Sequence, residues 1–159
     1  MVFATPASAV GTCSDHMKDA FDVTNPGDRP DQTYYVDNCV NVDDGKVSGY
    51  SDVSWQMLDL QAVDTSKRFS SFEITTRIEA WSGISDTDPD QVITSRTCDL
   101  TTVVNKHYEY GGPDGVCRAP STAFDKERWW SVDSTVVYDI VGDGKGKITR
   151  HMTGSPRVH

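Results

Sequence analysis

Hydrophobic and polar residues alternate along several segments of the chain, which is the pattern of β-strands with one buried face. The clearest segment runs from Ser70 to Trp81, and a second covers Trp130 to Ile140. In both, apolar side chains occupy every second position except for Thr76 and Ser134, while charged residues, Ser or Thr fill most of the others. We expect both segments to be strands that supply much of the core. The side chains expected to be buried are Phe72, Ile74, Ile78, Val136, Tyr138 and Ile140.

Less regular segments predict further strands. They are residues 33–41, 47–63, 91–104, 107–110, 116–118 and 147–152. Turn residues at 43–46, 111–115 and 142–146 separate neighbouring segments and are typical of hairpins. Six to eight strands without a convincing amphipathic helix indicate an all-β fold. We expect an antiparallel β-sandwich, immunoglobulin-like or related, with a barrel as the alternative.

The segment from Val10 to Gln32 does not follow this pattern. It is polar, is interrupted by Asn25-Pro26-Gly27 and by Pro30, and predicts at most one helical turn. We expect an irregular N-terminal arm in front of a sandwich domain at residues 33–159. Such an arm either covers a sheet edge of its own domain or lies across a partner. The arm residues expected to contact a partner are Asp15, His16, Lys18, Asp19 and Phe21.

The first nine residues have the character of a processed leader. Ala7 and Ala9 form the A-x-A pattern of a signal-peptidase site, so residues 1–9 are interpreted as the remnant of a signal peptide. A flexible terminus is the alternative interpretation. A remnant would mean that the protein is secreted and extracellular.

The four cysteines point to the same compartment, because an even number in a secreted chain favours disulfides. Three pairings are possible. Loop closure favours the local one, Cys13 with Cys39 and Cys98 with Cys117, since each bridge then closes a short loop. The first bridge would tether the arm to the first strand of the sandwich.

Charge and hydropathy exclude two classes of partner. The chain has 24 acidic and 15 basic residues, a net charge of -9, and no basic cluster that would neutralise phosphates. Nucleic acid is therefore not expected as a partner. No stretch is apolar over the roughly 18 residues that a membrane span requires. A membrane-spanning segment is therefore not expected. The acidity favours a basic protein surface or a cation.

Candidate chemistry is sparse. Asp86, Asp88 and Asp90 resemble the opening of a calcium loop, but Gln91 and Thr97 stand where such a loop needs Gly and Glu. We therefore expect no cofactor, with Ca²⁺ as the ion that this loop would suit. The alternative is a solvated acidic turn.

Catalytic motifs are absent from the sequence, since it contains no nucleophile elbow, no HExxH and no phosphate-binding loop. His107 and Glu109 share one face at strand spacing and are the residues on which a hydrolase would rest. Trp129 and Trp130 must point to opposite faces of a strand. If Trp130 faces the core, Trp129 is a protein hot spot, a sugar-stacking platform or a ring covered by the arm.

A leader ending in A-x-A, a cysteine shortly before Gly49-Tyr50-Ser51-Asp52-Val53-Ser54-Trp55, and the ending Thr153-Gly154-Ser155-Pro156-Arg157-Val158 together resemble small secreted proteins of streptomycetes. Within that group the chain is similar to the adaptor subunit of umbrella toxin particles. In those assemblies a small protein joins lectin subunits to a long toxin-bearing stalk. The resemblance implies a protein adaptor in a secreted hetero-complex, with no active site.

The function expected from the sequence is therefore a secreted, non-enzymatic adaptor or protein-binding module. A small secreted hydrolase or a carbohydrate-binding module is the alternative. A pocket lined by a His and a carboxylate would favour the hydrolase, whereas a flat or arm-crossed surface would favour the adaptor.

Overall fold

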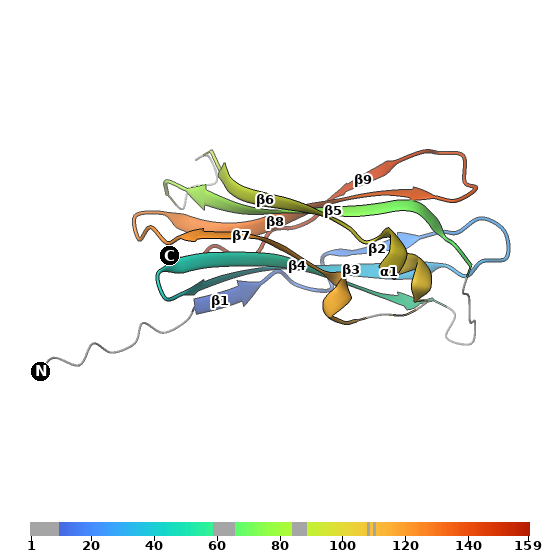
Figure 1. Ribbon diagram of the computed structural model, residues 1–159, viewed down its shortest axis with the longest axis horizontal. Coiled ribbons are helices and arrows are strands. Elements are labelled where there is room, and N and C mark those ends of the chain that lie inside the picture. The colour runs from blue at the N-terminus through green and yellow to red at the C-terminus, as the bar shows by residue number, and fades with distance from the viewer. Residues whose placement is uncertain (1–9, 59–65, 84–88, 108, 110) are drawn as a thin grey trace, which may run out of the picture.

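The computed structural model describes residues 10–58, 66–83, 89–107, 109 and 111–159. Two antiparallel sheets lie face to face (Figure 1), which confirms the expected β-sandwich. The first sheet has the order β1-β3-β4-β7, with β2 also paired to β3, and the second has the order β6-β5-β8-β9. The strands of the first sheet are β1 (Val10–Cys13), β2 (Ala20–Val23), β3 (Gln32–Asp43), β4 (Lys46–Met57) and β7 (Val116–Ala123). Those of the second are β5 (Phe69–Trp81), β6 (Gln91–Asp99), β8 (Trp129–Ile140) and β9 (Ile148–His151).

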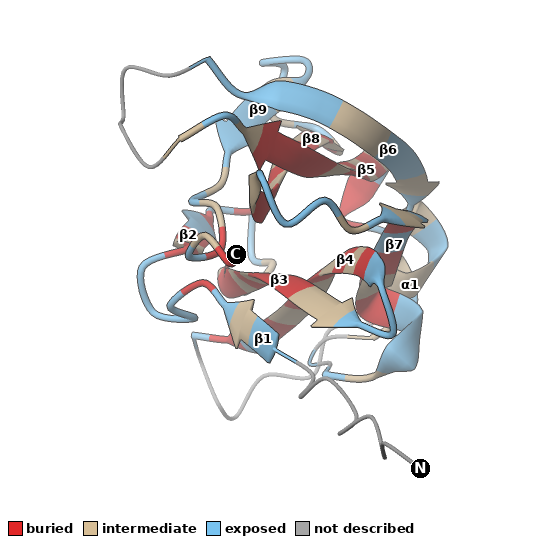
Figure 2. Ribbon diagram, turned by 90° about the vertical axis from the view of Figure 1, so that its left-hand side faces the viewer, coloured by how far each residue is buried: buried red, intermediate tan, exposed pale blue. Residues whose placement is uncertain are grey.

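The core lies where the two sheets face each other, as the buried residues in Figure 2 show. All six side chains expected in the core are buried, and Trp130 and Trp55 are buried with them. The apolar side chains form two clusters. The larger one contains Tyr34, Phe72 and Tyr138, and the smaller one contains Val47, Ile78 and Trp130. Period-two alternation therefore gave the correct face for each of the main strands.

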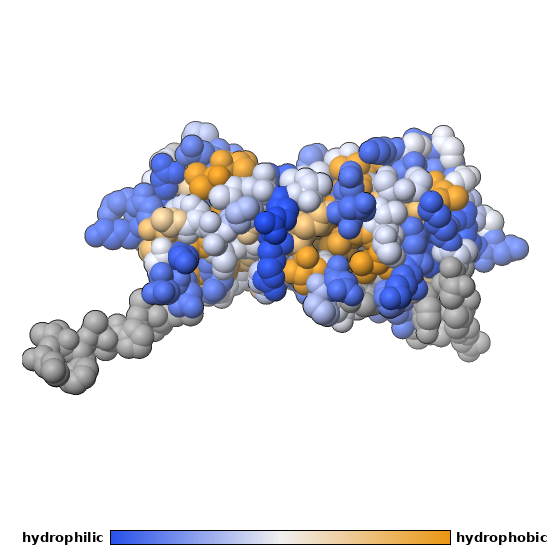
Figure 3. Space-filling model, in the orientation of Figure 1, coloured by the Kyte–Doolittle hydropathy of each residue, from blue (hydrophilic) through white to orange (hydrophobic). Residues whose placement is uncertain are grey.

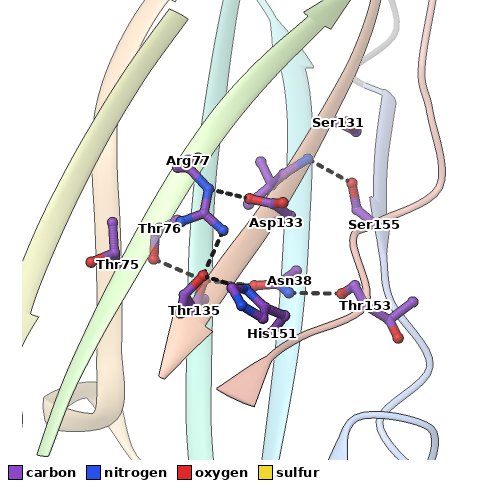
Figure 4. A network of polar contacts seen from close by, with 12 residues as sticks. Asn38, Thr75, Thr76, Arg77, Ser131, Asp133, Thr135, His151, Thr153 and Ser155 are labelled. Atoms are coloured by element: carbon purple, nitrogen blue, oxygen red, sulfur yellow. Dashed lines mark hydrogen bonds and ion pairs between the residues drawn. The ribbon is translucent and has the colours of Figure 1, made fainter. Parts of the chain in front are cut away.

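A layer of polar and small residues crosses the sandwich between these clusters. Each of the four central strands contributes one member: Asn38, Ser51, Thr76 and Ser134. Ser51 Oγ donates to Asn38 Oδ1 at 2.6 Å, Thr76 Oγ1 donates to Ser51 Oγ at 2.8 Å, and Asn38 Nδ2 donates to the Thr153 carbonyl at 2.8 Å (Figure 4). Beside this layer, a Cβ on Gly49 would lie 2.3 Å from Val132 Cγ2. The sheets approach closely here because Gly49 has no side chain.

The arm is more ordered than its sequence predicts. β1 and β2 both pair with β3, at Cys13↔Cys39 and Phe21↔Tyr34 among other positions, so that residues 10–23 form one edge strand interrupted by a turn. Main-chain pairing needs no apolar alternation, which is why the composition gave no signal. Val23 is also buried in the core. The arm therefore belongs to its own sandwich and covers one edge of it.

Both expected disulfides are confirmed. Cys13–Cys39 joins β1 to β3, and Cys98–Cys117 joins β6 of one sheet to β7 of the other. Thr94 Oγ1 also donates to the Pro120 carbonyl, at 2.7 Å, across the same seam. The second bridge thus closes one side of the sandwich.

Two local predictions are wrong. The strand expected over residues 91–104 ends at Asp99, and a short helix follows, α1 (Thr101–Lys106). Asp99 Oδ1 accepts from the Thr101 N–H at 2.9 Å, while Leu100 and Val104 face the core. The hairpin expected between residues 107–110 and 116–118 is not found among the described residues. Instead β7 pairs with β4, after the 3-10 turn η1 (Pro113–Gly115).

The buried Arg68 binds main-chain carbonyl groups at the C-terminal end of α1. Its guanidinium donates to the carbonyl of Val104 and, at 2.7 Å, to that of His107, where the helix leaves main-chain acceptors without partners in the helix. Trp55 Nε1 donates to the same His107 carbonyl at 2.9 Å.

Neither helix in the described part of the chain has the length and apolar character needed to cross a membrane.

Candidate functional site

The turn between β1 and β2, residues 14–19, is held at several points. Asp15 Oδ1 accepts from the Met17 N–H at 3.1 Å, and the Asp15 carbonyl accepts from the Lys18 N–H at 2.9 Å. Asp19 Oδ1 accepts from the Thr153 N–H at 2.7 Å, and Ser14 Oγ accepts from the Asn38 N–H at 2.9 Å. The turn is therefore fixed to the sandwich at both of its ends.

His16 lies over the outer face of the first sheet. Its Nδ1 is 2.7 Å from Asp37 Oδ2, and its ring stacks on Tyr35 with centroids 4.5 Å apart and planes 9° apart. Met17, next in the chain, is 72% exposed. The turn thus directs an apolar side chain and the exposed Lys18 toward solvent, beside a half-buried aromatic ring.

The expected arm residues divide into two groups. Asp15, His16 and Lys18 are exposed, in agreement with a contact role. Asp19 and Phe21 are buried in the protein itself, so the expectation that they contact a partner is corrected. Phe21 stacks on Tyr34 and Tyr138 at 5.6 Å, because the pairing of β2 with β3 directs its side chain into the core.

Two carboxyl groups face each other beneath His16. Asp37 on β3 pairs directly with Asp52 on β4, and each has one buried oxygen without a hydrogen-bond partner. Burial raises the pKa of Asp52, and the neighbouring charge of Asp37 raises it further, while His16 and Arg118 act in the opposite direction. Like charges directly opposite each other destabilise a sheet. The basic side chains of His16 and Arg118 offset that repulsion.

A shallow groove continues along the same face. It is lined by residues of β1, β3, β4 and β7, namely Gly11, Thr12, Cys13, Cys39, Val40, Asn41, Ser48, Tyr50 and Arg118. The Arg118 guanidinium carbon lies 4.7 Å from the centre of the Tyr50 ring. Tyr35 and Tyr50 are half-buried on this face, and each is covered by a basic side chain.

The outer face of the second sheet repeats this arrangement with tryptophans. Trp81 and Trp129 are cross-strand partners on β5 and β8, and both are half-buried. The Arg157 guanidinium carbon lies 3.7 Å from the centre of the Trp81 ring, and the His159 ring centre lies 4.8 Å from that of Trp129. The C-terminal segment therefore covers Trp129, a role that the sequence suggested for the arm.

A small acidic hollow lies beside Trp81. Glu79, Asp90, Asp133 and Ser131 line it together with Arg157. Burial raises the pKa of Glu79 to about 8, and the charges of Asp133 and Asp90 add to this effect. Asp133 is engaged by Arg77 Nε at 2.7 Å, and Arg77 Nη2 donates to Thr135 Oγ1 at 2.9 Å (Figure 4).

The remaining candidates are the acidic loop at Asp86, Asp88 and Asp90 and the pair His107 and Glu109. Asp86 and Asp88 lie outside the described residues, and Asp90 is exposed at the start of the segment leading to β6. Among the residues that the structure describes, no group of three His, Cys, Asp or Glu side chains could hold a metal ion. His107 ends α1 through its main chain, and Glu109 is exposed after it, so no strand face joins them.

Sequence reasoning missed the contacts of His16 with Asp37 and Tyr35. The outward position of Asp37 and Tyr35 on their strand could be inferred, but the fold of the arm over them could not.

Comparison with protein-family models, curated proteins and solved structures finds no match.

Proposed function

We propose that this chain is a secreted, non-enzymatic adaptor that binds other proteins in an extracellular assembly of the umbrella-toxin kind. The observation that carries the proposal is the outer face of the first sheet. There Tyr35 and Tyr50 lie half-buried beneath His16 and Arg118, next to the exposed Met17. Aromatic and Arg side chains are enriched among the residues that dominate the energy of protein interfaces.

The fixed turn supports a protein partner. A loop already held in one conformation loses little conformational freedom on binding, so more of its contact energy appears as affinity. Met17 is displayed on such a loop, between a disulfide and the hydrogen bond of Asp19 to Thr153. The partner surface that would fit this turn has an apolar pocket for Met17 and acidic groups near Lys18.

Covered aromatic rings make the carbohydrate-binding alternative less favourable. A sugar stacks on an open ring face, but Tyr35, Tyr50, Trp81 and Trp129 each have one face beneath His or Arg. The side of the molecule seen in Figure 3 offers no broad apolar surface either, because a hydrophilic stripe separates its apolar groups. The two disulfides are compatible with an oxidising, extracellular environment.

The test is capture of named partners by the tagged, full-length protein. The proteins offered are the lectin and stalk subunits of an umbrella particle from the same organism. We expect the wild type to capture at least one of them, and Met17→Glu to weaken that capture at least tenfold. Because Met17 is exposed, the variant should unfold at the same urea concentration as the wild type.

Leu58→Glu is the matched control, since Leu58 is 54% exposed and directly follows the last residue of β4, away from the turn that carries Met17. It should capture the partner as the wild type does. Failure of the wild type to capture either subunit would refute the adaptor proposal. Equal loss in both variants would instead refute the assignment of the Met17 face.

A further inference from the structure

The C-terminal segment lies along the edge of β8 that β9 leaves open. β9 pairs with β8 only over residues 135–138. Beyond it, the Met152 N–H donates to Ser134, the Ser155 N–H to Val132, and Val158 and Trp130 exchange two hydrogen bonds of 2.8 Å. Residues 152–158 thus occupy the position of an added edge strand, although regular pairing ends at His151.

The last three side chains of this segment contact three different parts of the second sheet and its core. Arg157 lies over Trp81, Val158 enters the smaller core cluster, and His159 lies over Trp129. This is the alternation of an extended segment on a sheet edge, in which main-chain bonds hold the segment and alternate side chains enter sites on either side.

The surroundings of Arg157 favour a cation. Glu79, Asp90 and Asp133 line the same hollow, and the Trp81 ring forms another part of it. An aromatic face together with carboxyl groups binds a guanidinium both by its charge and by its plane. Arg77 already pairs with Asp133, and burial raises the pKa of Glu79 so that it holds a proton, which makes Asp90 the carboxylate that faces the incoming cation.

The part of the segment that reaches the two tryptophans, residues 156–159, is attached mainly through Val158. Of these four residues, Val158 is the buried one. Segments with few buried contacts open at a small free-energy cost compared with the core. A second peptide with the same pattern can therefore form the same contacts when the segment is displaced.

We propose that the edge of β8 at Trp129, with the Trp81 ring of β5 beside it, is a peptide-binding site. Its ligand is an extended basic segment of a partner protein, with arginine, an apolar residue and a planar residue in succession, and the chain's own residues 157–159 occupy the site in its absence. The proposal rests on the proposed protein-binding function and assigns it a second surface, on the sheet opposite Met17.

The test uses full-length protein and the synthetic peptide Gly-Ser-Pro-Arg-Val-His, which repeats residues 154–159. The tethered segment competes at a high effective concentration, so the peptide should bind the wild type poorly. In the double variant Arg157→Ser/His159→Ser we expect at least tenfold tighter binding. NMR signals of the indole N–H groups report it, with Trp81 and Trp129 shifting and Trp55, in the other core cluster, unchanged.

Two controls separate recognition from non-specific binding. A peptide with alanine in place of arginine should bind the double variant about tenfold more weakly, and Arg150→Ser, on β9, should leave the affinity at the wild-type value. Absence of saturable shifts at millimolar peptide, or equal binding of the alanine peptide, would overturn the proposal. Neither result would affect capture through the Met17 face, which is measured separately.

Discussion

At the residue scale, Glu79 is a carboxyl group held away from water on the outer face of the second sheet. Its pKa of about 8 exceeds the ordinary value of 4.5, so the folded protein binds a proton that the unfolded chain releases. The stability associated with that proton is complete below about pH 4.5 and is lost as the pH rises to about 8.

We expect Glu79→Gln to remove this pH dependence. In urea unfolding, the variant should gain stability relative to the wild type as the pH is raised from 5 to 8, by up to about 1.4 kcal/mol for each pKa unit of the shift. Glu73→Gln, on the same strand and the same outer face, is the control. Parallel pH profiles for Glu79→Gln and the wild type would contradict the protonated state of Glu79.

Replacing Gly49 by alanine tests how closely the two sheets are packed at this position. A methyl group there would meet Val132 Cγ2 and Ile78 Cγ1, which belong to two strands of the opposite sheet. We expect Gly49→Ala to lower the free energy of unfolding by about 1 to 3 kcal/mol, the usual cost of overpacking a core. Gly111→Ala should be nearly neutral, since the nearest atom to its Cβ, Ser54 Cβ, lies at an ordinary 3.8 Å. Equal urea midpoints for the two variants would show that the sheets can separate without cost.

At the element scale, Asn105 attaches α1 to the start of β5 through three hydrogen bonds. Asn105 Oδ1 accepts from the main-chain N–H groups of Arg68 and Phe69, and its Nδ2 donates to the Phe69 carbonyl. Asn105→Ala leaves these groups without partners and should cost about 1 to 3 kcal/mol. Thr102→Ala, exposed on the same helix, should cost less than about 0.5 kcal/mol. If chemical denaturation gives the same cost for both, the attachment lies elsewhere.

The elements show how far local pattern can predict this fold. The long strands could be predicted because Phe72, Ile74 and their counterparts repeat with period two and each buries one face. α1 could not, because Leu100 and Val104 have the spacing of a single helical turn, which also fits the end of a strand. The strands of the arm were missed for another reason: their stability comes from β3, which alternation within the arm does not record.

The site residues of the arm differ in the same way. Asp15, His16 and Lys18 lie in a polar, turn-rich segment and are exposed, and their contact with a partner stays a prediction. Asp19 could not be placed, since its partner Thr153 is distant in sequence and reaches it only through the folded sandwich. The covering of Trp129 by His159 is equally non-local. Non-local contacts between irregular segments have no periodicity, so the sequence alone does not reveal them.

At the scale of the whole molecule, Cys98–Cys117 is the covalent link between the two sheets. Replacing both cysteines by alanine should cost about 3 kcal/mol, because the unfolded chain regains the freedom that the closed loop removes. Hydrogen exchange should accelerate first in β6 and β7, the strands on either side of the bridge. A loss of protection that begins in β1 would mean that the seam is held mainly by other contacts.

The other disulfide bears on how the protein would respond to tension. Tension applied at Val10 passes from Cys13 directly into β3 through a covalent bond, so only the residues before Cys13 can peel away. Tension applied at His159 meets the single bridge between Val158 and Trp130, whose hydrogen bonds can open one after another. The attachment of β1 is therefore mechanically stronger than that of Val158, because a covalent bond carries the load at Cys13 and hydrogen bonds alone carry it at Val158.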